Sequence, residues 1–165
     1  MEVIPGSDTC ENCGMDLQDL NLGAVNPPAG LERSILHHCI SELNPPAPVT
    51  VSQNETVEGV VKKMNNRHHG AVCVVDSDGK LVGIFTERDA VKRVAAKQVN
   101  ISVTPISSVM TREPATMRIQ DNLGAILNKM SDAGFRHVPI LDGDRLVGIT
   151  SVRGVLNYIA EKALS

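Results

Sequence analysis

A hydroxyl and a carboxylate three residues apart, Thr86 and Asp89, lie where an apolar run, residues 81–85, gives way to a helical one. Such a pair begins a helix well, because the hydroxyl accepts a hydrogen bond from a free N–H group of the first turn and the acid complements the positive end of the helix. The same two groups can also bind a polar ligand. From these residues alone, a helix cap and a ligand contact both remain open.

A second cluster with chemical potential lies near the N-terminus, where Cys10 and Cys13 form a Cys-x-x-Cys-Gly knuckle with Gly14. Glycine permits the tight turn that two thiolates need to hold one tetrahedral zinc ion. The predicted remaining ligands are His38 and Cys39, on a helix predicted over residues 31–43. A leader with free thiols and a redox-active cysteine pair are the alternatives, and Cys39 would then be a core residue.

The elements that position these groups occur twice in the chain. The residues from Pro48 to Asp76 match those from Pro114 to Asp142 at an offset of 66 without a gap. The turn that follows is one residue shorter in the second copy, so that the later residues match at an offset of 65. Thr86 is then equivalent to Ser151, and Asp89 to Gly154. A tandem repeat of this kind predicts two similar structural units.

Each copy has the pattern of a strand, a helix, two strands and a helix. Apolar residues at helical spacing predict the first helix, and an Asp/Gly turn joins the two strands. The predicted strands are residues 49–51, 71–75 and 81–85 in the first copy and 115–118, 137–141 and 146–150 in the second. The predicted closing helices are residues 87–97 and 153–164, and residues 98–107 form the linker. We expect the two small sheets to pack on each other.

Composition limits the classes of protein to which the chain can belong. The chain has 165 residues, of which 42% are hydrophobic and 2% aromatic, with no Trp. The core must therefore consist of aliphatic residues and Met. A net charge of −3 provides no basic field for nucleic acid or for a membrane surface. No apolar run is long enough to span a membrane and the start does not resemble a signal peptide, so a cytoplasmic location is expected.

With these motifs the sequence resembles the tandem CBS-domain pair, or Bateman module. The resemblance rests on Gly-hydrophobic-x-Thr/Ser-x-x-Asp at the end of the first copy, which recurs in the second with Gly154 in place of Asp, on Ser108-Val109-Met110-Thr111, and on residues 136–142. It covers roughly residues 41–161. It implies an α/β (α+β) fold of two β-α-β-β-α repeats packed through their sheets. The expected organisation is an extension over residues 1–40, a first repeat over 41–103 and a second over 104–165.

The resemblance implies a binding site for an adenosine-containing ligand, AMP, ADP, ATP or S-adenosylmethionine, in a cleft between the repeats. Asp89 would accept hydrogen bonds from the ribose hydroxyls, and Thr86 would lie near the ribose and phosphate. In the family the opposite repeat supplies the phosphate-binding cations, here Arg136 and His137. The strand residues predicted to surround the adenine are Val49, Thr50, Ala71, Val72 and Ile84.

The two clefts are predicted to be unequal. The second has Ser151, but Gly154 takes the place of the ribose carboxylate. By the alignment, this cleft would face Gly70 and Ala71, which carry no charge. We therefore expect one nucleotide-binding cleft and one degenerate cleft, with His68 and His69 as solvated residues at a helix end.

The function implied by the resemblance is regulatory binding, with the ligand signal acting in trans on an unknown protein effector. The family also implies a homodimer, for which the residues predicted to supply the surface are Val91, Val94, Val155, Leu156, Tyr158 and Ile159. The alternative is a structural scaffold with vestigial clefts, held by dimerisation and zinc. No nucleophile and base constellation is evident in the sequence, so we do not expect an enzyme.

Overall fold

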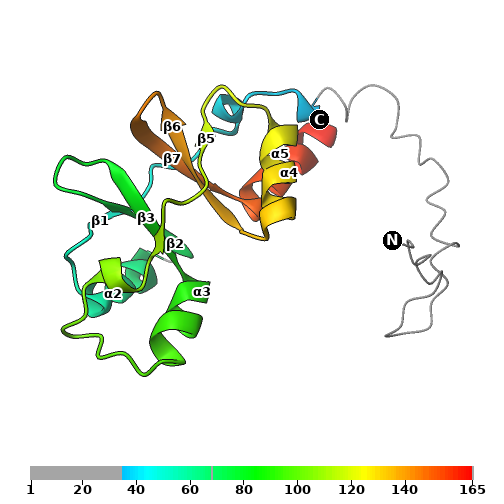
Figure 1. Ribbon diagram of the computed structural model, residues 1–165. Coiled ribbons are helices and arrows are strands. Elements are labelled where there is room, and N and C mark those ends of the chain that lie inside the picture. The colour runs from blue at the N-terminus through cyan, green and yellow to red at the C-terminus, as the bar shows by residue number, and fades with distance from the viewer. Residues whose placement is uncertain (1–34, 68, 165) are drawn as a thin grey trace, which may run out of the picture.

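The computed structural model describes residues 35–67 and 69–164. Each repeat folds as predicted into an α/β unit (Figure 1). The elements of the first repeat are β1 (Thr50–Ser52), α2 (Val57–Arg67), β2 (Ala71–Val75), β3 (Leu81–Thr86), α3 (Glu87–Asp89) and η2 (Ala90–Ala95). Those of the second are β5 (Met117–Arg118), α4 (Leu123–Ala133), β6 (His137–Asp142), β7 (Arg145–Ser151) and α5 (Val152–Ala163).

Each sheet has the same central pattern. In the first, β2 pairs parallel with β1 and antiparallel with β3, and in the second, β6 pairs parallel with β5 and antiparallel with β7. The tight turns between β2 and β3 and between β6 and β7 place Gly79 at φ 77° and Gly143 at φ 60°. Glycine adopts this left-handed conformation without steric cost, which explains the Asp/Gly turns of the sequence.

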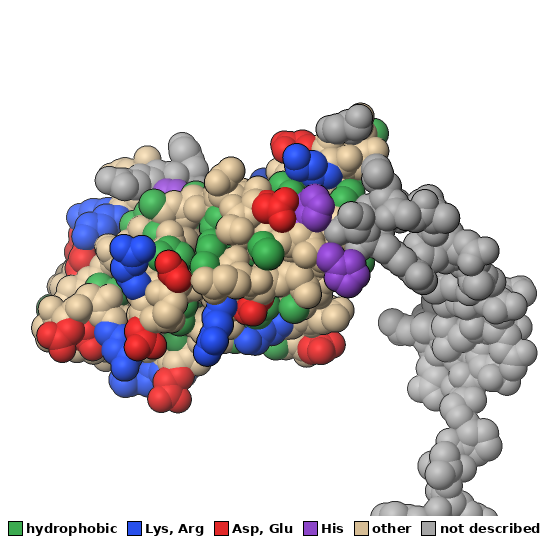
Figure 2. Space-filling model, turned by 90° about the horizontal axis from the view of Figure 1, so that it is seen from above, with side chains coloured by type: hydrophobic (Ala, Val, Ile, Leu, Met, Phe, Trp, Pro, Cys, Tyr) green, Lys and Arg blue, Asp and Glu red, His purple; other side chains and the backbone are tan. Residues whose placement is uncertain are grey.

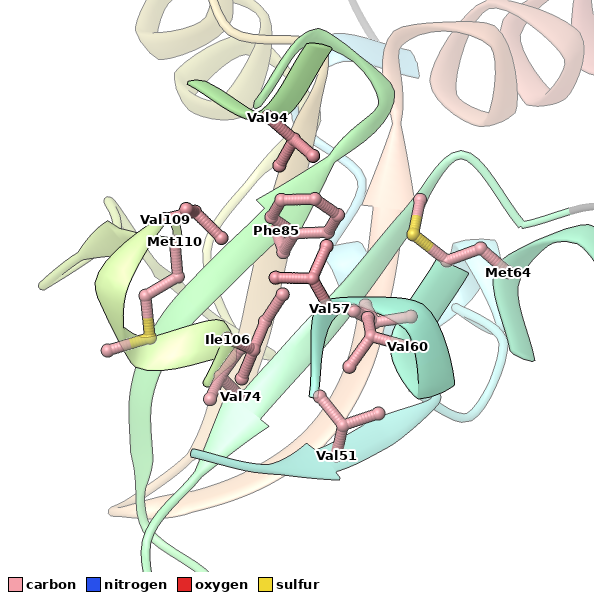
Figure 3. Close-up of a cluster of buried hydrophobic side chains, with 11 residues drawn as sticks. Val51, Val57, Val60, Met64, Val74, Phe85, Val94, Ile106, Val109 and Met110 are labelled. Carbon is pink, nitrogen blue, oxygen red and sulfur yellow. The ribbon is translucent and has the colours of Figure 1, made fainter. Parts of the chain in front are cut away.

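Two separate hydrophobic cores follow the repeat. The first contains Val57, Val60, Met64, Val72, Val74 and Phe85 (Figure 3), and the second contains Leu123, Ile126, Met130, Val138 and Ile140. The aliphatic side chains sit at equivalent positions in the two repeats, with Phe85 as the large side chain of the first core. Cys73 is fully buried among them, and burial raises the pKa of its thiol to about 12, so that it packs as a small hydrophobe.

The segment before each repeat packs on the other repeat. η1 (Ile40–Leu43) lies beside α4 and α5 (Figure 1), and the Ile40 N–H donates to the Asp121 carbonyl at 2.8 Å. η3 (Ile106–Ser108) packs on the first repeat, where the Ile106 N–H donates to the Glu55 carbonyl at 2.8 Å. The side chains of Ile40 and Ile106 are fully buried in the two cores. Each repeat therefore completes its core with residues that the sequence places outside it.

The first sheet has a fourth strand, β4 (Thr111–Arg112), which pairs antiparallel with β3. No strand was predicted at these residues, which follow the predicted linker over residues 98–107. The equivalent residues before the first repeat are Pro45 and Pro46 at the offset of 66. Only one bond remains there, from the Ile149 N–H to the Pro46 carbonyl at 3.1 Å. Proline has no N–H group, so that this edge cannot form a full strand pair.

Two predicted helices differ from the structure. In the described part of the helix predicted over residues 31–43, residues 37–39 are not helical, and Cys39 adopts an extended conformation (φ −72°, ψ 150°) that starts η1. The helix predicted over residues 87–97 has only one α-helical turn, α3. It continues as the π-helix η2, with a bond from the Ala96 N–H to the Val91 carbonyl at 3.0 Å. Propensity does not signal such an extra residue in a helical turn.

The predicted dimer surface is only partly exposed. Val94, Val155 and Tyr158 lie in the cores, and Ile159 packs partly against the second core. Only Val91, 64% exposed, and Leu156, 53% exposed, remain free to contact another molecule. Acidic and basic side chains intermingle on the face shown in Figure 2. No helix in residues 35–67 and 69–164 is long and apolar enough to cross a membrane.

Candidate functional site

A cavity of about 420 Å³, here called the first cavity, lies where the two repeats meet. The first repeat contributes the end of β3 and the turn of α3, with Thr86 and Asp89. The second contributes Arg136 and His137 at the start of β6. The structure therefore brings together, from positions about 50 residues apart in the sequence, the hydroxyl, the carboxylate and the basic residues that the sequence proposed as one site.

Thr86 and Asp89 form a reciprocal capping box. The Thr86 hydroxyl accepts from the Asp89 N–H at 3.3 Å, and Asp89 Oδ2 accepts from the Thr86 N–H at 3.0 Å and from its hydroxyl at 2.9 Å. Asp89 is only 8% exposed. A buried carboxylate is costly unless its oxygens are hydrogen-bonded. The helix cap thus explains why an acid is stable here, and the cap leaves that acid on the cavity wall.

The other carboxylate oxygen of Asp89 has partners outside the cap. Asp89 Oδ1 accepts from the Thr111 hydroxyl at 3.2 Å and lies 3.4 Å from Arg93 Nε. Arg93 in turn donates to the carbonyl of Val109 at 3.4 Å and to that of Met110. A carboxylate has about four acceptor directions. The two bonds to Oδ2 and the one from Thr111 leave one direction on Oδ1, to which a ligand hydroxyl can donate if it displaces the long contact with Arg93.

The opposite wall carries two unequal basic groups. Arg136 is exposed and forms no ion pair within the described part of the chain, including none with Asp132. His137 is half-buried, and burial lowers the pKa of its imidazole, an effect that Arg136 reinforces and Glu87 opposes. At neutral pH the arginine is therefore the permanent cation of this wall.

The residues predicted to surround an adenine are mostly elsewhere. Ile84 lines the first cavity, but Val49 and Val72 pack in the first core and Thr50 is exposed on the edge strand β1. None of these three residues lines the first cavity, and the adenine contacts stay a prediction. Ala71 is buried and lines a different cavity.

Several residues of the first cavity were missed as candidates for the site. Thr111 comes from the segment just before the second repeat, Pro114 and Ala115 from the start of that repeat, and Phe135 precedes the basic pair. Gly70, Glu87, Arg88 and Val91 also line the cavity. The pairing of β4 with β3 brings that segment to the cavity. A signal was present in the motif that ends at Thr111, but only the strand pairing shows that its hydroxyl meets Asp89.

A second cavity of about 860 Å³ lies at the equivalent position of the other repeat. Ser151 caps α5 there by accepting from the Gly154 N–H at 3.1 Å, and the wall includes Gly70 and Ala71. Gly70 and Ala71 line this cleft as expected, but charged residues that the alignment did not indicate line it as well. Its charged and titratable lining residues are His69, Glu87, Arg136, His137 and Arg153. The alignment compared equivalent positions only, whereas Arg136 and His137 border both cavities.

Of the predicted zinc ligands, Cys10 and Cys13 lie outside the described residues. His68, predicted as a solvated residue at a helix end, lies outside them as well. His38 Nδ1 lies 2.8 Å from the Tyr158 hydroxyl and 3.3 Å from Glu42 Oε2. The Cys39 N–H donates to Glu42 Oε1 at 3.1 Å. The described part of the chain contains no group of three His, Cys, Asp or Glu side chains arranged for a metal ion. The zinc site therefore stays a prediction.

Arg112 is exposed and donates to the Ser107 carbonyl at 3.1 Å, and it lines neither cavity. Arg112 is thus a surface arginine of the described residues.

Comparison with known proteins identifies the repeat. The family model of the CBS domain matches residues 40–96 and 106–161. An uncharacterized 17.7 kDa protein of Acidianus ambivalens is 30% identical over 123 residues, which are 74% of this chain and 73% of that protein. The CBS domain-containing protein CBSCBSPB1 of Arabidopsis thaliana is 28% identical over 84% of this chain. The matched region spans 25% of that relative, and 19% of two further Arabidopsis relatives.

Solved structures show the same fold. An uncharacterized conserved protein from Pyrococcus horikoshii has a TM-score of 0.70 at 25% identity, covering 74% of this chain and 92% of its own. The CBS-domain containing protein ATU1752 from Agrobacterium tumefaciens has a TM-score of 0.67 at 29% identity, with coverages of 74% and 93%. The CBS domain pair of protein MJ0100, solved with methylthioadenosine and S-adenosyl-L-methionine, has a TM-score of 0.68 at 25% identity, with coverages of 76% and 98%. With two matches of the family model and this shared fold, the chain belongs to the CBS-domain family as a tandem pair.

Proposed function

We propose that this protein is a regulatory module that binds an adenosine-containing ligand in the first cavity. The observation that carries the proposal is the position of the Asp89 carboxylate, buried and fixed by the helix cap, on one wall of a cavity whose other wall holds Arg136 and His137. The carboxylate would accept a hydrogen bond from a ribose hydroxyl, and the arginine would bind a phosphate or carboxylate group. The ligands of the MJ0100 pair support an adenosyl compound.

Binding would change the relative stability of two packings of the repeats, because the ligand contacts both of them. Asp89, Thr111 and Arg93 connect the cavity to the carbonyls of Val109 and Met110. A ribose hydroxyl that donates a hydrogen bond to Asp89 Oδ1 would compete with these contacts. The response would then be read by a domain or protein outside these two repeats. A homodimer, a cytoplasmic location and the absence of catalysis belong to this proposal as predictions.

One observation favours the alternative of a scaffold with vestigial clefts. The carboxylate of Asp89 already has bonds from Thr86 and Thr111 and a contact with Arg93, so that it has a structural role without any ligand. The two functions differ in a direct measurement. A scaffold would bind no adenosyl compound, whereas the proposed module binds one.

The test is isothermal titration calorimetry of the full chain with AMP, ATP and S-adenosylmethionine. Asp89→Asn keeps the shape and an acceptor for the Thr86 N–H but removes the charge. We expect it to weaken binding by about 1.5–3 kcal/mol, the contribution of a charge-assisted hydrogen bond. Asp144→Asn is the matched control, since Asp144 is exposed in the β6–β7 turn and lines neither cavity. Equal affinities of the two variants would assign the carboxylate to the fold alone.

A further inference from the structure

The lining of the second cavity has the chemistry of an anion site without a ribose acceptor at the usual place. Gly154 replaces the aspartate there, while Arg136 and Arg153 supply two permanent cations. Glu87 is the one carboxylate among the described lining residues. The two positive charges of the arginines outnumber the single negative charge of Glu87, and His137 interacts electrostatically with Glu87. An anion with several charges is therefore better suited to this cavity than a nucleoside.

The helix that follows the third strand of the second repeat adds to the preference of this cavity for an anion. Arg153 lies in the first turn of α5, a helix of 12 residues whose N-terminus carries a partial positive charge. Ile149 and Ser151 line the cavity from β7. Thr150, only 5% exposed, takes the place of Phe85 at the offset of 65, so that its side chain lies on the core face of β7.

The two cavities share a wall. Gly70, Glu87, Arg136 and His137 line both of them. Gly70 adds no side chain to this wall. A Cβ at that position would lie 3.2 Å from the His137 imidazole. The register of the second sheet pairs His137 with Ser151, and the Val152 N–H donates to the Arg136 carbonyl at 3.0 Å. The basic end of the first cavity is therefore directly beside the anion-binding end of the second.

We propose that the two cavities form one elongated site for a nucleoside diphosphate or triphosphate. This inference rests on the proposed function, in which the nucleoside occupies the first cavity with its ribose on Asp89. The first phosphate would bind Arg136, and the following phosphates would extend past Gly70 to Arg153 and the start of α5. A monophosphate would end at the shared wall and leave the second cavity unused.

The test is calorimetric titration of the full chain with AMP, ADP and ATP, without divalent cations. We expect one equivalent of each nucleotide per chain and an affinity that rises from AMP to ATP. Arg153→Gln should weaken ATP by about ten- to hundredfold, the effect of one charge-assisted contact, and leave AMP within about twofold. Arg145→Gln is the control, because Arg145 is an exposed arginine of the same repeat that lines neither cavity. Inorganic triphosphate should compete with ATP more strongly than with AMP.

Several results would overturn the inference while leaving the proposed function intact. They are AMP and ATP of equal affinity, an equal effect of Arg153→Gln on both nucleotides, and two equivalents of ATP per chain. If no adenosyl compound binds the wild-type chain, the proposed function fails and the inference fails with it. Thermal unfolding of each variant distinguishes a loss of contact from a loss of folded protein.

Discussion

The two clefts of this protein have equivalent backbones but different chemistry, and the differences are linked. The first has Asp89 with Thr111 and Arg93 around its carboxylate. At the offsets of the repeat, 65 for Asp89 and Arg93 and 66 for Thr111, the second has Gly154, Tyr158 and Pro45 instead. All three members of the network are absent together. A buried acid needs its partners, so once the acid is absent the partner positions are free to serve packing.

Tyr158 shows what replaced the network. Its ring belongs to the second core, and its hydroxyl meets His38 Nδ1 at 2.8 Å. The equivalent Arg93 is partly exposed and donates hydrogen bonds to the carbonyls of Val109 and Met110, directly before β4. The first repeat therefore uses this helix position to connect its cleft to the linker, whereas the second uses it to hold the segment before the first repeat. The comparison predicts that both repeats contribute to stability, whereas the ribose carboxylate comes from the first cleft alone.

The largest expected effect tests whether the two exchanged segments are equally structural. Ile40→Ala and Ile106→Ala each remove a fully buried side chain from the core of the repeat on which it packs. We expect each to lower the free energy of unfolding by about 2–5 kcal/mol, measured by urea denaturation. Val103→Ala, at a position 71% exposed, is the control and should change little. A neutral Ile40→Ala would show that the segment before the first repeat is dispensable for the fold.

The next largest effect is the loss of unfolding free energy when a helix cap is removed, and the two caps should differ in it. Ser151→Ala removes the acceptor for the Gly154 N–H and should cost about 1 kcal/mol of unfolding free energy. Thr86→Ala removes the same kind of acceptor and also a hydroxyl donor to the buried Asp89, so we expect a loss nearer to 2 kcal/mol. Thermal or urea unfolding measures both. Equal losses would mean that the carboxylate gains nothing from the threonine hydroxyl.

Restoring the acid in the second cleft gives a smaller effect. A Cβ on Gly154 would lie at an ordinary contact distance of 3.4 Å from Thr150 Oγ1, so that a side chain fits. Gly154→Asp places a negative charge in the first turn of α5 and should be more stable than Gly154→Asn by about 0.3–1 kcal/mol. The two variants differ in charge but hardly in shape, which isolates the electrostatic part. An aspartate variant no more stable than the asparagine one would show that the nearby acid Glu87 cancels the benefit.

The smallest expected effect is the pH dependence of stability that His137 causes. This histidine is the second-repeat equivalent of Ala71. Burial lowers the pKa of His137 in the folded protein below its ordinary value of 6.5, with Arg136 acting in the same direction and Glu87 against it. Between these two pKa values the unfolded chain binds more protons than the folded one. Stability should therefore be constant above pH 6.5 and fall as the pH drops through 6.5 to the folded pKa.

His137→Gln should flatten this part of the pH dependence, measured as urea midpoints between about pH 5 and 8. His37→Gln, at an exposed position, is the control. A bound phosphate would raise the pKa of His137, so that nucleotide binding should strengthen as the pH falls. An unchanged slope in His137→Gln would place the titrating group elsewhere.

Much of the fold was determined by local pattern. The strand from Ala71 to Val75 matches its predicted bounds, and the cores follow the apolar positions of the repeat, because helical and strand periodicity are read directly from the sequence. The helix distortion after Asp89 and the strand at Thr111 were not predicted. The strand depends on a partner distant in sequence, the edge of β3.

The sequence by itself determined that the chain contains two related α/β units and that only the first carries an acid after its third strand. The tertiary structure alone decided which residues share a wall. It placed Arg136 and His137 between two cavities. It also completed the core of each repeat with the segment that precedes the other repeat in the sequence. The physical reason is that periodicity specifies which face of an element is buried, whereas the crossing of one unit over the other depends on contacts between residues far apart in the chain.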